Sequence, residues 1–268
     1  MDLGLSGQTA LITGSAAGIG LAVAQEFARE GCDVVLWDQS PKVKDMASQI
    51  ALQYGVTAHG DCVDVASEDL VSQTALSIIQ RFGSLRHVVH CAAVGSGTHG
   101  YPFTNLTPSD WTRPVQVNLM GMVHLSHAFA PGFVAAKKGS FVFVGSVAGQ
   151  IGSQTDPPYS ATKAANINFA QCMAKDLAPH QVRVNVVCPG MVKTDLNRSV
   201  WESWLHGRDE SERLDYDQWS EQKISQVVPL GRWQSSSDIA NMVLFLASDR
   251  ASQVTGQTIN VDGGYVMR

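Results

Sequence analysis

The feature that most constrains the fold of this chain is a glycine-rich turn between its first strand pattern and its first helix pattern. An apolar run at Gln8–Thr13 leads into Thr13–Gly20, which reads Thr-Gly-Ser-Ala-Ala-Gly-Ile-Gly, and an amphipathic stretch follows at Ile19–Arg29. Glycine permits a tight turn and lets backbone N–H groups approach a pyrophosphate, while a helix N-terminus adds partial positive charge there. A glycine triplet alone is weak evidence, but this position between strand and helix predicts a dinucleotide-binding βα unit.

Apolar runs and amphipathic stretches alternate along the rest of the chain, which predicts an α/β fold. Strands are expected at Gln8–Thr13, Asp33–Trp37, Val56–Gly60, His87–Cys91, Ser140–Val144, Arg183–Cys188 and Thr258–Val261. Helices are expected at Ile19–Arg29, Lys42–Tyr54, Glu68–Phe82, Pro108–Ala136, Ser160–Ala178 and Ser236–Ala247. This alternation predicts a doubly wound, seven-stranded parallel sheet with helices on both faces, the Rossmann arrangement. Because no repeat or low-complexity linker divides the sequence, residues 1–268 are expected to form a single domain.

One long segment, Asp195–Val228, interrupts this alternation. It shows no strand pattern, is rich in charge, and carries Trp201, Trp204, Tyr216 and Trp219. Long ordered excursions are often functional, so this segment is a candidate substrate lid at about 195–228. The alternative is a surface excursion whose aromatic side chains only pack it against the domain.

The composition argues against several classes of function. The 268 residues carry a formal net charge of -5 and no cluster of Lys and Arg, whereas a nucleic-acid-binding domain usually presents a basic face. No apolar run reaches the roughly 18 residues that a membrane span needs, and Met1–Gly7 does not resemble a secretion signal. The five cysteines are scattered without a Cys-x-x-Cys pair, so we expect no metal site, no disulfide framework and a cytoplasmic protein.

The end of the second predicted strand carries the residue that indicates which dinucleotide binds. Asp38 follows that strand, where a carboxylate can accept hydrogen bonds from the adenosine ribose and repel a 2′-phosphate. Neither the next residue, Gln39, nor Ser15 in the glycine turn supplies a cation for such a phosphate. The sequence therefore favours NAD over NADP, unless Asp38 only caps the following turn.

Tyr159 and Lys163 form the candidate proton-transfer pair. They are four residues apart at the start of a predicted helix and so share one face. A free phenol has a pKa of about 10, and a nearby ammonium or a positively charged nicotinamide ring favours the phenolate. Such a pair can act as a general base in alcohol oxidation or as an acid in ketone reduction. The alternative is a pair without a catalytic role, an exposed lysine beside a half-buried tyrosine.

Ser146 lies just after the predicted strand Ser140–Val144, at the edge where open α/β sheets bind ligands. A hydroxyl there can hold a substrate oxygen for Tyr159, although a serine at this place is also an ordinary turn residue.

Taken together, these motifs resemble those of the short-chain dehydrogenase/reductase family, in its single-domain, NAD-dependent Rossmann branch. The resemblance covers nearly the whole chain and rests on residues 13–20, Asp64-Val65, Asn118 in Val117-Asn118-Leu119, Ser146, Tyr159, Lys163, Pro189–Thr194, Val254–Gln257 and Val261–Gly264.

The resemblance implies a role for each residue of the site. Tyr159 would exchange the proton, Lys163 would hold the nicotinamide ribose and depress the phenol pKa, and Ser146 would orient the substrate oxygen. Asn118 would anchor a water that relays protons through Lys163. Contacts to the cofactor are expected from Gly14, Ser15, Gly18, Ile19, Gly20, Asp38, Gln39, Asp64, Val65, Cys91, Ala92, Ala93, Asn118, Tyr159, Lys163, Pro189, Gly190, Val192 and Thr194.

The segment His90-Cys91-Ala92-Ala93 departs from the family pattern, which usually reads Asn-Asn-Ala-Gly. We expect Cys91 to fill the buried asparagine position as a small apolar residue, and His90 to satisfy backbone groups in the core rather than act as an acid. Ala93 adds a methyl group where backbone approaches the cofactor. Altered cofactor affinity is therefore expected, with catalysis retained.

The expected activity is reversible NAD-dependent oxidation of a secondary alcohol, a sugar or polyol, to the ketone. An NAD(P)H-dependent ketoreductase, such as a 3-oxoacyl thioester reductase, and a secondary aromatic or aliphatic alcohol dehydrogenase stay open as alternatives. A non-catalytic NAD sensor is a third class, but it would not need Ser146, Tyr159 and Lys163 together. By family analogy a homotetramer is expected, assembled through the long helices Pro108–Ala136 and Ser160–Ala178.

Overall fold

The computed structural model describes residues 2–83, 85–205 and 209–267, and within them the strands form one seven-stranded parallel sheet in the order β3-β2-β1-β4-β5-β6-β7. The strands are β1 (Thr9–Thr13), β2 (Asp33–Asp38), β3 (Ala58–Cys62), β4 (His87–His90), β5 (Gly139–Val144), β6 (Val182–Pro189) and β7 (Thr258–Val261). The chain runs outward from β1 to β3 and then crosses to β4 beside β1. That reversal of strand order is where open α/β sheets bind ligands. The predicted Rossmann sheet is confirmed.

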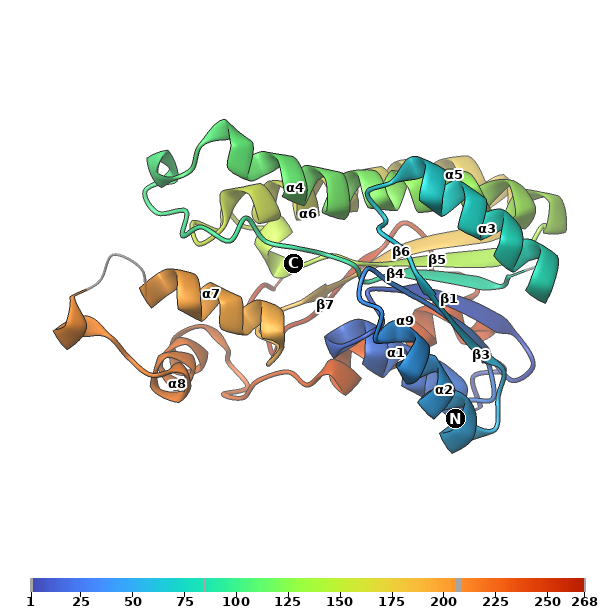
Figure 1. The fold of residues 1–268 in the computed structure, drawn as a ribbon, viewed down its shortest axis with the longest axis horizontal. Coiled ribbons are helices and arrows are strands. Elements are labelled where there is room, and N and C mark those ends of the chain that lie inside the picture. The colour runs from blue at the N-terminus through green and yellow to red at the C-terminus, as the bar shows by residue number, and fades with distance from the viewer. Residues whose placement is uncertain (1, 84, 206–208, 268) are drawn as a thin grey trace.

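Helices cover both faces of the sheet, as predicted (Figure 1). They are α1 (Gly18–Arg29), α2 (Val43–Tyr54), α3 (Glu68–Phe82), α4 (Thr112–Pro114), α5 (Gly121–Ala136), α6 (Pro157–Leu177), α7 (Asp195–Leu205), α8 (Tyr216–Val227) and α9 (Ser236–Ala247). In Figure 1, α3, α5 and α6 lie on one face, and α1, α2 and α9 lie on the other.

Two apolar clusters, one on each face of the sheet, hold these layers together. One contains Trp37, Phe141 and Phe143 with the inner residues of α3, α5 and α6, and the other contains Phe27, Leu36 and the inner residues of α1 and α9. Because side chains alternate along a strand, the central strands bury residues on both faces and carry almost continuous apolar runs.

The predicted helix at Pro108–Ala136 is continuous but irregular. It begins with a 3₁₀ turn at Pro108–Trp111, passes through α4, has a π-helical stretch at Val115–Met120, and ends as α5. By length and hydropathy this segment could cross a membrane, but the core helix of a soluble protein passes the same test. Its inner face, including Met122, Leu125 and Phe129, packs in the apolar cluster beneath α3 and α6.

The segment predicted as a lid contains two helices, α7 and α8, that project beyond one end of the sheet (Figure 1). Asp215 caps α8 by accepting from the Gln218 backbone N–H, and the Gln218 side chain accepts from the Asp215 N–H. Tyr216 stacks on Trp219 with ring centroids 6.1 Å apart, and both side chains are buried. None of the α7 residues and only four of the α8 residues are buried, and both helices are rich in charge, so neither resembles the apolar core helices in sequence.

Candidate active site

The glycine turn closes tightly against its neighbours. A Cβ on Gly14 would lie 2.7 Å from the Ala92 backbone, and one on Gly20 would lie 2.1 Å from the Gly14 carbonyl oxygen. Gly14 and Gly18 also have positive φ angles, at 65° and 57°. Glycine is therefore required here for both space and conformation. Among the described residues no side chain caps the first turn of α1, so its N–H groups are available to an anion such as a pyrophosphate.

Asp38 lies at the end of β2 and is held against the glycine turn. Its Oδ2 accepts from the Ala16 N–H at 3.0 Å and its Oδ1 from the Ser40 N–H at 2.8 Å. The carboxylate lines a small cavity of about 90 Å³, the side cavity, which is also bounded by Gly14, Gln39, Asp64, Val65, Ala92, Ala93 and Arg113. Two backbone donors fix the carboxylate where a ribose could reach it.

Arg113 is a residue that sequence reasoning missed. It lies on α4, far along the chain from Asp38, yet it donates to Asp64 Oδ2 at 3.0 Å and to Gln39 Oε1 at 3.1 Å. The fold therefore places one cation at the side cavity, although the local sequence around Asp38 contains none. Its charge is already paired with Asp64, and its side chain is 47% exposed.

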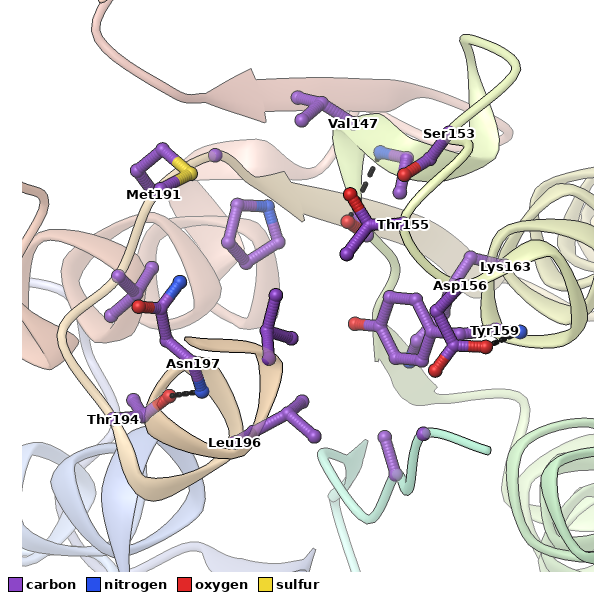
Figure 2. A pocket seen from close by; sticks show the side chains of 18 of the residues that line it. Val147, Ser153, Thr155, Asp156, Tyr159, Lys163, Met191, Thr194, Leu196 and Asn197 are labelled. Atoms are coloured by element: carbon purple, nitrogen blue, oxygen red, sulfur yellow. Dashed lines mark hydrogen bonds between the residues drawn. The ribbon is translucent and has the colours of Figure 1, made fainter. Parts of the chain in front are cut away.

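A second cavity, of about 240 Å³, opens at the carboxyl ends of β4, β5 and β6, and we call it the central cavity. Of the predicted site residues, Ile19, Cys91, Ala93, Ser146, Tyr159, Lys163, Pro189, Gly190, Val192 and Thr194 line it. Figure 2 shows the Tyr159 hydroxyl directed into the space between Leu196 and Asn197 on one side and Val147 and Thr155 on the other.

Tyr159 is positioned by the start of α6. Asp156 caps this helix by accepting from the Tyr159 N–H at 3.2 Å, and its second carboxylate oxygen accepts from the Ser96 N–H at 2.8 Å. Pro157 at the first helical position supports the same start. Asp156 thus ties the loop after β4 to the residue that carries the phenol, a connection that local sequence did not indicate.

The pKa of Tyr159 is raised to about 12 in this structure, chiefly because the phenol is buried, with a smaller increase from Asp156 and a decrease from the Ser146 hydroxyl. The resemblance had implied that Lys163 would depress this pKa. The Lys163 ammonium instead donates to the Val144 carbonyl at 2.7 Å and lies 5.5 Å from the centroid of the Tyr159 ring. Burial also lowers the pKa of Lys163 to about 8, so its charge is costly where it lies.

Ser146 follows β5 and lies in the same cavity. Its side chain accepts from the Ala148 N–H at 3.1 Å, which leaves its hydroxyl proton available as a donor. The close approach of Gly149 to the backbone of Lys163, where a Cβ would meet the Lys163 carbonyl carbon at 2.6 Å, packs the serine turn onto α6. This packing brings Ser146, Tyr159 and Lys163 together.

Asn118 lies in the π-helical stretch and is fully buried. Its Oδ1 accepts from the Val94 N–H at 2.8 Å, and its Nδ2 donates to the Val94 carbonyl at 2.9 Å and to the Thr162 hydroxyl at 3.0 Å. The side-chain amide therefore ties the loop after β4 to α6. It is committed to these protein contacts, so the expected water relay would have to use the Asn118 backbone rather than its side chain.

His90 and Cys91 occupy the positions that depart from the family pattern. His90 is buried, and its Nδ1 pairs with the Thr13 hydroxyl at 2.8 Å. Burial lowers the pKa of His90 to about 3 and raises the pKa of the Cys91 thiol to about 12, so both are neutral. Cys91 behaves as a small, unreactive wall residue of the central cavity.

Of the remaining predicted residues, Gly14, Gln39, Asp64, Val65 and Ala92 line the side cavity, whereas Gly18, Gly20 and Ser15 line neither cavity. Ser15 is turned into the core. Its hydroxyl donates to the Ile12 and Trp37 carbonyls at 3.0 Å and 3.2 Å, so it joins β1 to β2 rather than facing a ligand. Any cofactor contact by Ser15 would have to come from its backbone.

The segment predicted as a lid contributes side chains to the central cavity, of which only Trp219 had been singled out from the sequence. Leu196, Asn197, Ser199, Val200 and Ser203 of α7 and Trp219 and Lys223 of α8 line it, and Met191 lies before α7. No group of three or more His, Cys, Asp or Glu side chains suited to a metal ion occurs in the part of the chain that the structure describes.

Comparisons with known proteins agree with this geometry. A family model described as enoyl-(acyl carrier protein) reductase matches residues 14–266. The chain is 34% identical over 265 residues to a 3-oxoacyl-(acyl-carrier-protein) reductase, FabG, of Aquifex aeolicus, covering 98% of this chain and 99% of the relative. It is 33% identical to an uncharacterized oxidoreductase, YxjF, of Bacillus subtilis, covering 96% and 98%.

Solved structures show the same architecture. The L-sorbose reductase of Gluconobacter frateurii, crystallised with NADPH and L-sorbose, matches with a TM-score of 0.90 at 28% identity, covering 100% of both chains. A putative NAD(P)-dependent gluconate 5-dehydrogenase of Beutenbergia cavernae, with bound NADP, matches with a TM-score of 0.87 at 28% identity, covering 99% of both.

Proposed function

The chain belongs to the short-chain dehydrogenase/reductase family, and from this premise we propose that it oxidises a secondary alcohol, a sugar or polyol, to the ketone with NAD in a reversible reaction. Membership of the family makes the chain an oxidoreductase for alcohol and carbonyl groups. Its glycine turn and α1 fit a nicotinamide dinucleotide, because the N–H groups of the first turn of α1 have no side-chain cap and would bind the pyrophosphate.

The observation that carries the proposal is the placement of the Tyr159 hydroxyl in one cavity with Ser146 and Lys163, next to the glycine turn. The Ser146 hydroxyl would hold the substrate oxygen, and the Tyr159 oxygen would take the carbinol proton in oxidation or return it in reduction. When bound, the nicotinamide supplies the acceptor or donor of the hydride and, when oxidised, a positive charge that favours phenolate. Lys163 would bind the nicotinamide ribose and orient the ring.

The choice of NAD rests on Asp38. Its carboxylate is fixed by the Ala16 and Ser40 N–H groups at the side cavity, where it would accept from the ribose hydroxyls and repel a 2′-phosphate. Arg113 lines the same cavity and is a cation that could favour a 2′-phosphate, but its guanidinium already donates to Asp64 and Gln39. The predicted contacts of Gly14, Gly18 and Gly20 belong to the same proposal.

The sugar or polyol assignment rests on the polar side chains that lie among the largely apolar lining of the central cavity. Thr98, Ser153, Thr155, Asn197, Ser199 and Ser203 line it and can match several hydroxyl groups. Residues of α7 and α8 line the same cavity, which supports the proposal that residues 195–228 act as a substrate lid. We further expect residues 1–268 to form one domain and the protein to be cytoplasmic. We also expect it to assemble as a homotetramer, which gel filtration tests.

A second candidate, reduction of a 3-oxoacyl thioester with NADPH, is favoured by the relatives. The Aquifex aeolicus relative is named as such a reductase, and the sorbose reductase structure holds NADPH. Asp38 argues against it, because a carboxylate fixed at the ribose would repel the extra phosphate.

One assay separates the two. NADH formation is measured with secondary alcohols and polyols, and NADPH consumption with an acetoacetyl thioester, using the same preparation. Faster turnover with NAD and a polyol supports the proposal. Turnover only with NADPH and the thioester would replace it by the second candidate, and no turnover of any kind would contradict both.

A further inference from the structure

One cationic side chain of the central cavity has no part in the proton transfer described above. Lys223 lies on α8 and lines the cavity together with Trp219, one turn earlier on the same helix. Its ammonium lies 4.9 Å from the centroid of the Trp219 ring, and burial lowers its pKa. Across residues 2–83, 85–205 and 209–267, no acidic side chain pairs with this ammonium. A partly desolvated charge is therefore left without a carboxylate from the protein.

The other charges that line the cavity do not offset it. Asp156 is the one acidic side chain among the described lining residues, and both of its oxygens already accept from the Tyr159 and Ser96 N–H groups. Lys163 is a second cation, and it donates to the Val144 carbonyl. The cavity is thus cationic, although the chain as a whole carries a net charge of -5.

Trp219 adds a second donor that has no acceptor. Its side chain is only 2% exposed, and its indole N–H is buried with no hydrogen-bond partner among the described residues. The indole N–H is enclosed by protein, so the Lys223 ammonium is the donor on this wall that a ligand can reach, and it favours a ligand that carries acceptor oxygens there.

The helix that carries these two donors is well fixed. The reciprocal cap between Asp215 and Gln218 holds its start, and Tyr216, Trp219 and Ile224 are buried beneath it. The Trp219 ring also supports the Lys223 ammonium through a cation–π contact. The charge is therefore held on a rigid element at the wall of the cavity rather than on a free surface side chain.

We propose that the substrate is a polyhydroxy carboxylate, whose carbinol carbon lies at Tyr159 and whose carboxylate pairs with Lys223. The inference rests on the proposed function, since it assigns a further part of the same cavity. The hydroxyls of Ser199 and Ser203 on α7 each donate to a carbonyl of that helix, so their oxygens can accept from the hydroxyl groups of such a chain. The Asn197 carbonyl oxygen accepts from Tyr216, so its amide N–H groups can donate to them. A neutral polyol would fill the same wall but leave the Lys223 ammonium unpaired.

Lys193 provides a matched control. It also lies near the lid and contacts an aromatic ring, with its ammonium 5.7 Å from the centroid of Tyr216. Its side chain is 58% exposed and lies 3.6 Å from an Asp217 carboxylate oxygen, and it does not line the central cavity. Lys193→Gln removes the same charge from the same region without removing it from the cavity.

The test compares gluconate and galactonate with sorbitol and galactitol, which have the same carbon number but no carboxylate. The wild type is expected to show a kcat/KM at least 10-fold higher for an acid than for its matched polyol. Lys223→Gln is expected to raise the KM for that acid by about 10- to 100-fold with a smaller change in kcat, as for loss of a charge-assisted contact. Lys223→Arg should restore most of the loss, and Lys193→Gln should change the KM by less than about 2-fold.

The outcomes separate this inference from the proposed function. Turnover of polyols with no preference for acids, or an equal loss for acid and polyol in Lys223→Gln, would overturn the inference and leave the function standing. If no alcohol is oxidised, the proposed function fails, and acid binding is then read from the tryptophan fluorescence of the NADH-loaded protein. A gluconate-dependent change that is lost in Lys223→Gln and kept in Lys193→Gln would support the carboxylate site, and its absence would overturn it.

Discussion

Replacing Asp38 with Asn is expected to weaken the preference for NAD over NADP by about two orders of magnitude. The substitution keeps the size of the side chain and one acceptor oxygen but removes the charge. In the structure that charge is fixed at the side cavity by two backbone donors, at 3.0 Å and 2.8 Å. The carboxylate is therefore presented to the ribose without having to reorganise.

The magnitude follows from two contributions. A hydrogen bond to a charged acceptor is worth about 1.5–3 kcal/mol and a neutral one about 0.5–1.5 kcal/mol, so two ribose contacts lose about 2 kcal/mol together. For NADP the substitution also removes a repulsion, which is about 4 kcal/mol for unit charges 4 Å apart at an effective dielectric constant of about 20 and smaller where solvent enters. A factor of ten corresponds to about 1.4 kcal/mol, so the loss of ribose contacts and of part of the repulsion together predict a change of about 100-fold in the ratio of kcat/KM for NAD to kcat/KM for NADP.

The assay measures kcat/KM for both cofactors with one saturating alcohol, and thermal unfolding shows whether the glycine turn is intact. The thermal control matters because one Asn oxygen cannot serve both the Ala16 and Ser40 N–H groups. Arg113→Gln is the matched variant, because it removes a charge from the same cavity; since Asp64 and Gln39 hold that guanidinium, it should change the cofactor ratio much less than Asp38→Asn. A cofactor ratio that stays constant in Asp38→Asn, in a protein of unchanged stability, would refute the reasoning.

The other predictions concern proton transfer, the glycine turn and acid stability. Tyr159→Phe should lower kcat by at least about 100-fold while NAD still binds by calorimetry, because only the ionisable oxygen is lost; near-normal turnover would show that another group exchanges the proton. Gly20→Ala should unfold at lower temperature and bind NAD weakly, since its Cβ would lie 2.1 Å from the Gly14 carbonyl oxygen; wild-type values for both would contradict this packing. His87 and His90 each have a pKa lowered to about 3 by burial, so they stay neutral in the folded state while the unfolded chain takes up protons below pH 6.5. The contribution of these two histidines to the free energy of unfolding is therefore fully present above about pH 6.5. It falls toward pH 3 by up to about 1.4 kcal/mol per pH unit for each histidine. Urea unfolding at pH 7 and pH 5 would measure this fall, and an equal free energy of unfolding at both would rule out this account.

The sheet and its long helices were predictable because burial on both faces leaves a strong pattern in the sequence. The strands at β1, β4 and β7 and the helices at α3 and α9 agree with the predicted ranges to within one residue at each end. The strand predicted at Val56–Gly60 lies instead at Ala58–Cys62. This edge strand pairs with β2 alone and carries polar residues, so its apolar pattern is short and placed the strand two residues too early.

The site residues also fall into those that a local sequence pattern predicts and those that it does not. Asp38, Ser146 and Tyr159 follow strands or begin a helix, where chain order alone places them at the carboxyl edge of a parallel sheet. Arg113, Asp156 and Lys223 are brought to the cavities by tertiary packing of irregular segments, and no local period marks them. Arg113 shows the consequence, since the local sequence around Asp38 indicated no cation at the side cavity, yet α4 brings one there.

The segment His90-Cys91 shows how a departure from a family pattern can be compensated within the core. The Thr13 hydroxyl accepts from the Ala92 N–H at 3.3 Å, so its own proton is available to His90 Nδ1, which lies 2.8 Å away. This assignment makes Nδ1 the acceptor and keeps the buried imidazole neutral, in agreement with its lowered pKa. A neutral His90 adds no second positive charge beside Lys163, and the unreactive Cys91 thiol adds no negative one. The pKa of Tyr159 therefore depends on its burial and on Ser146 and Asp156, with no charge contributed by the two departing positions.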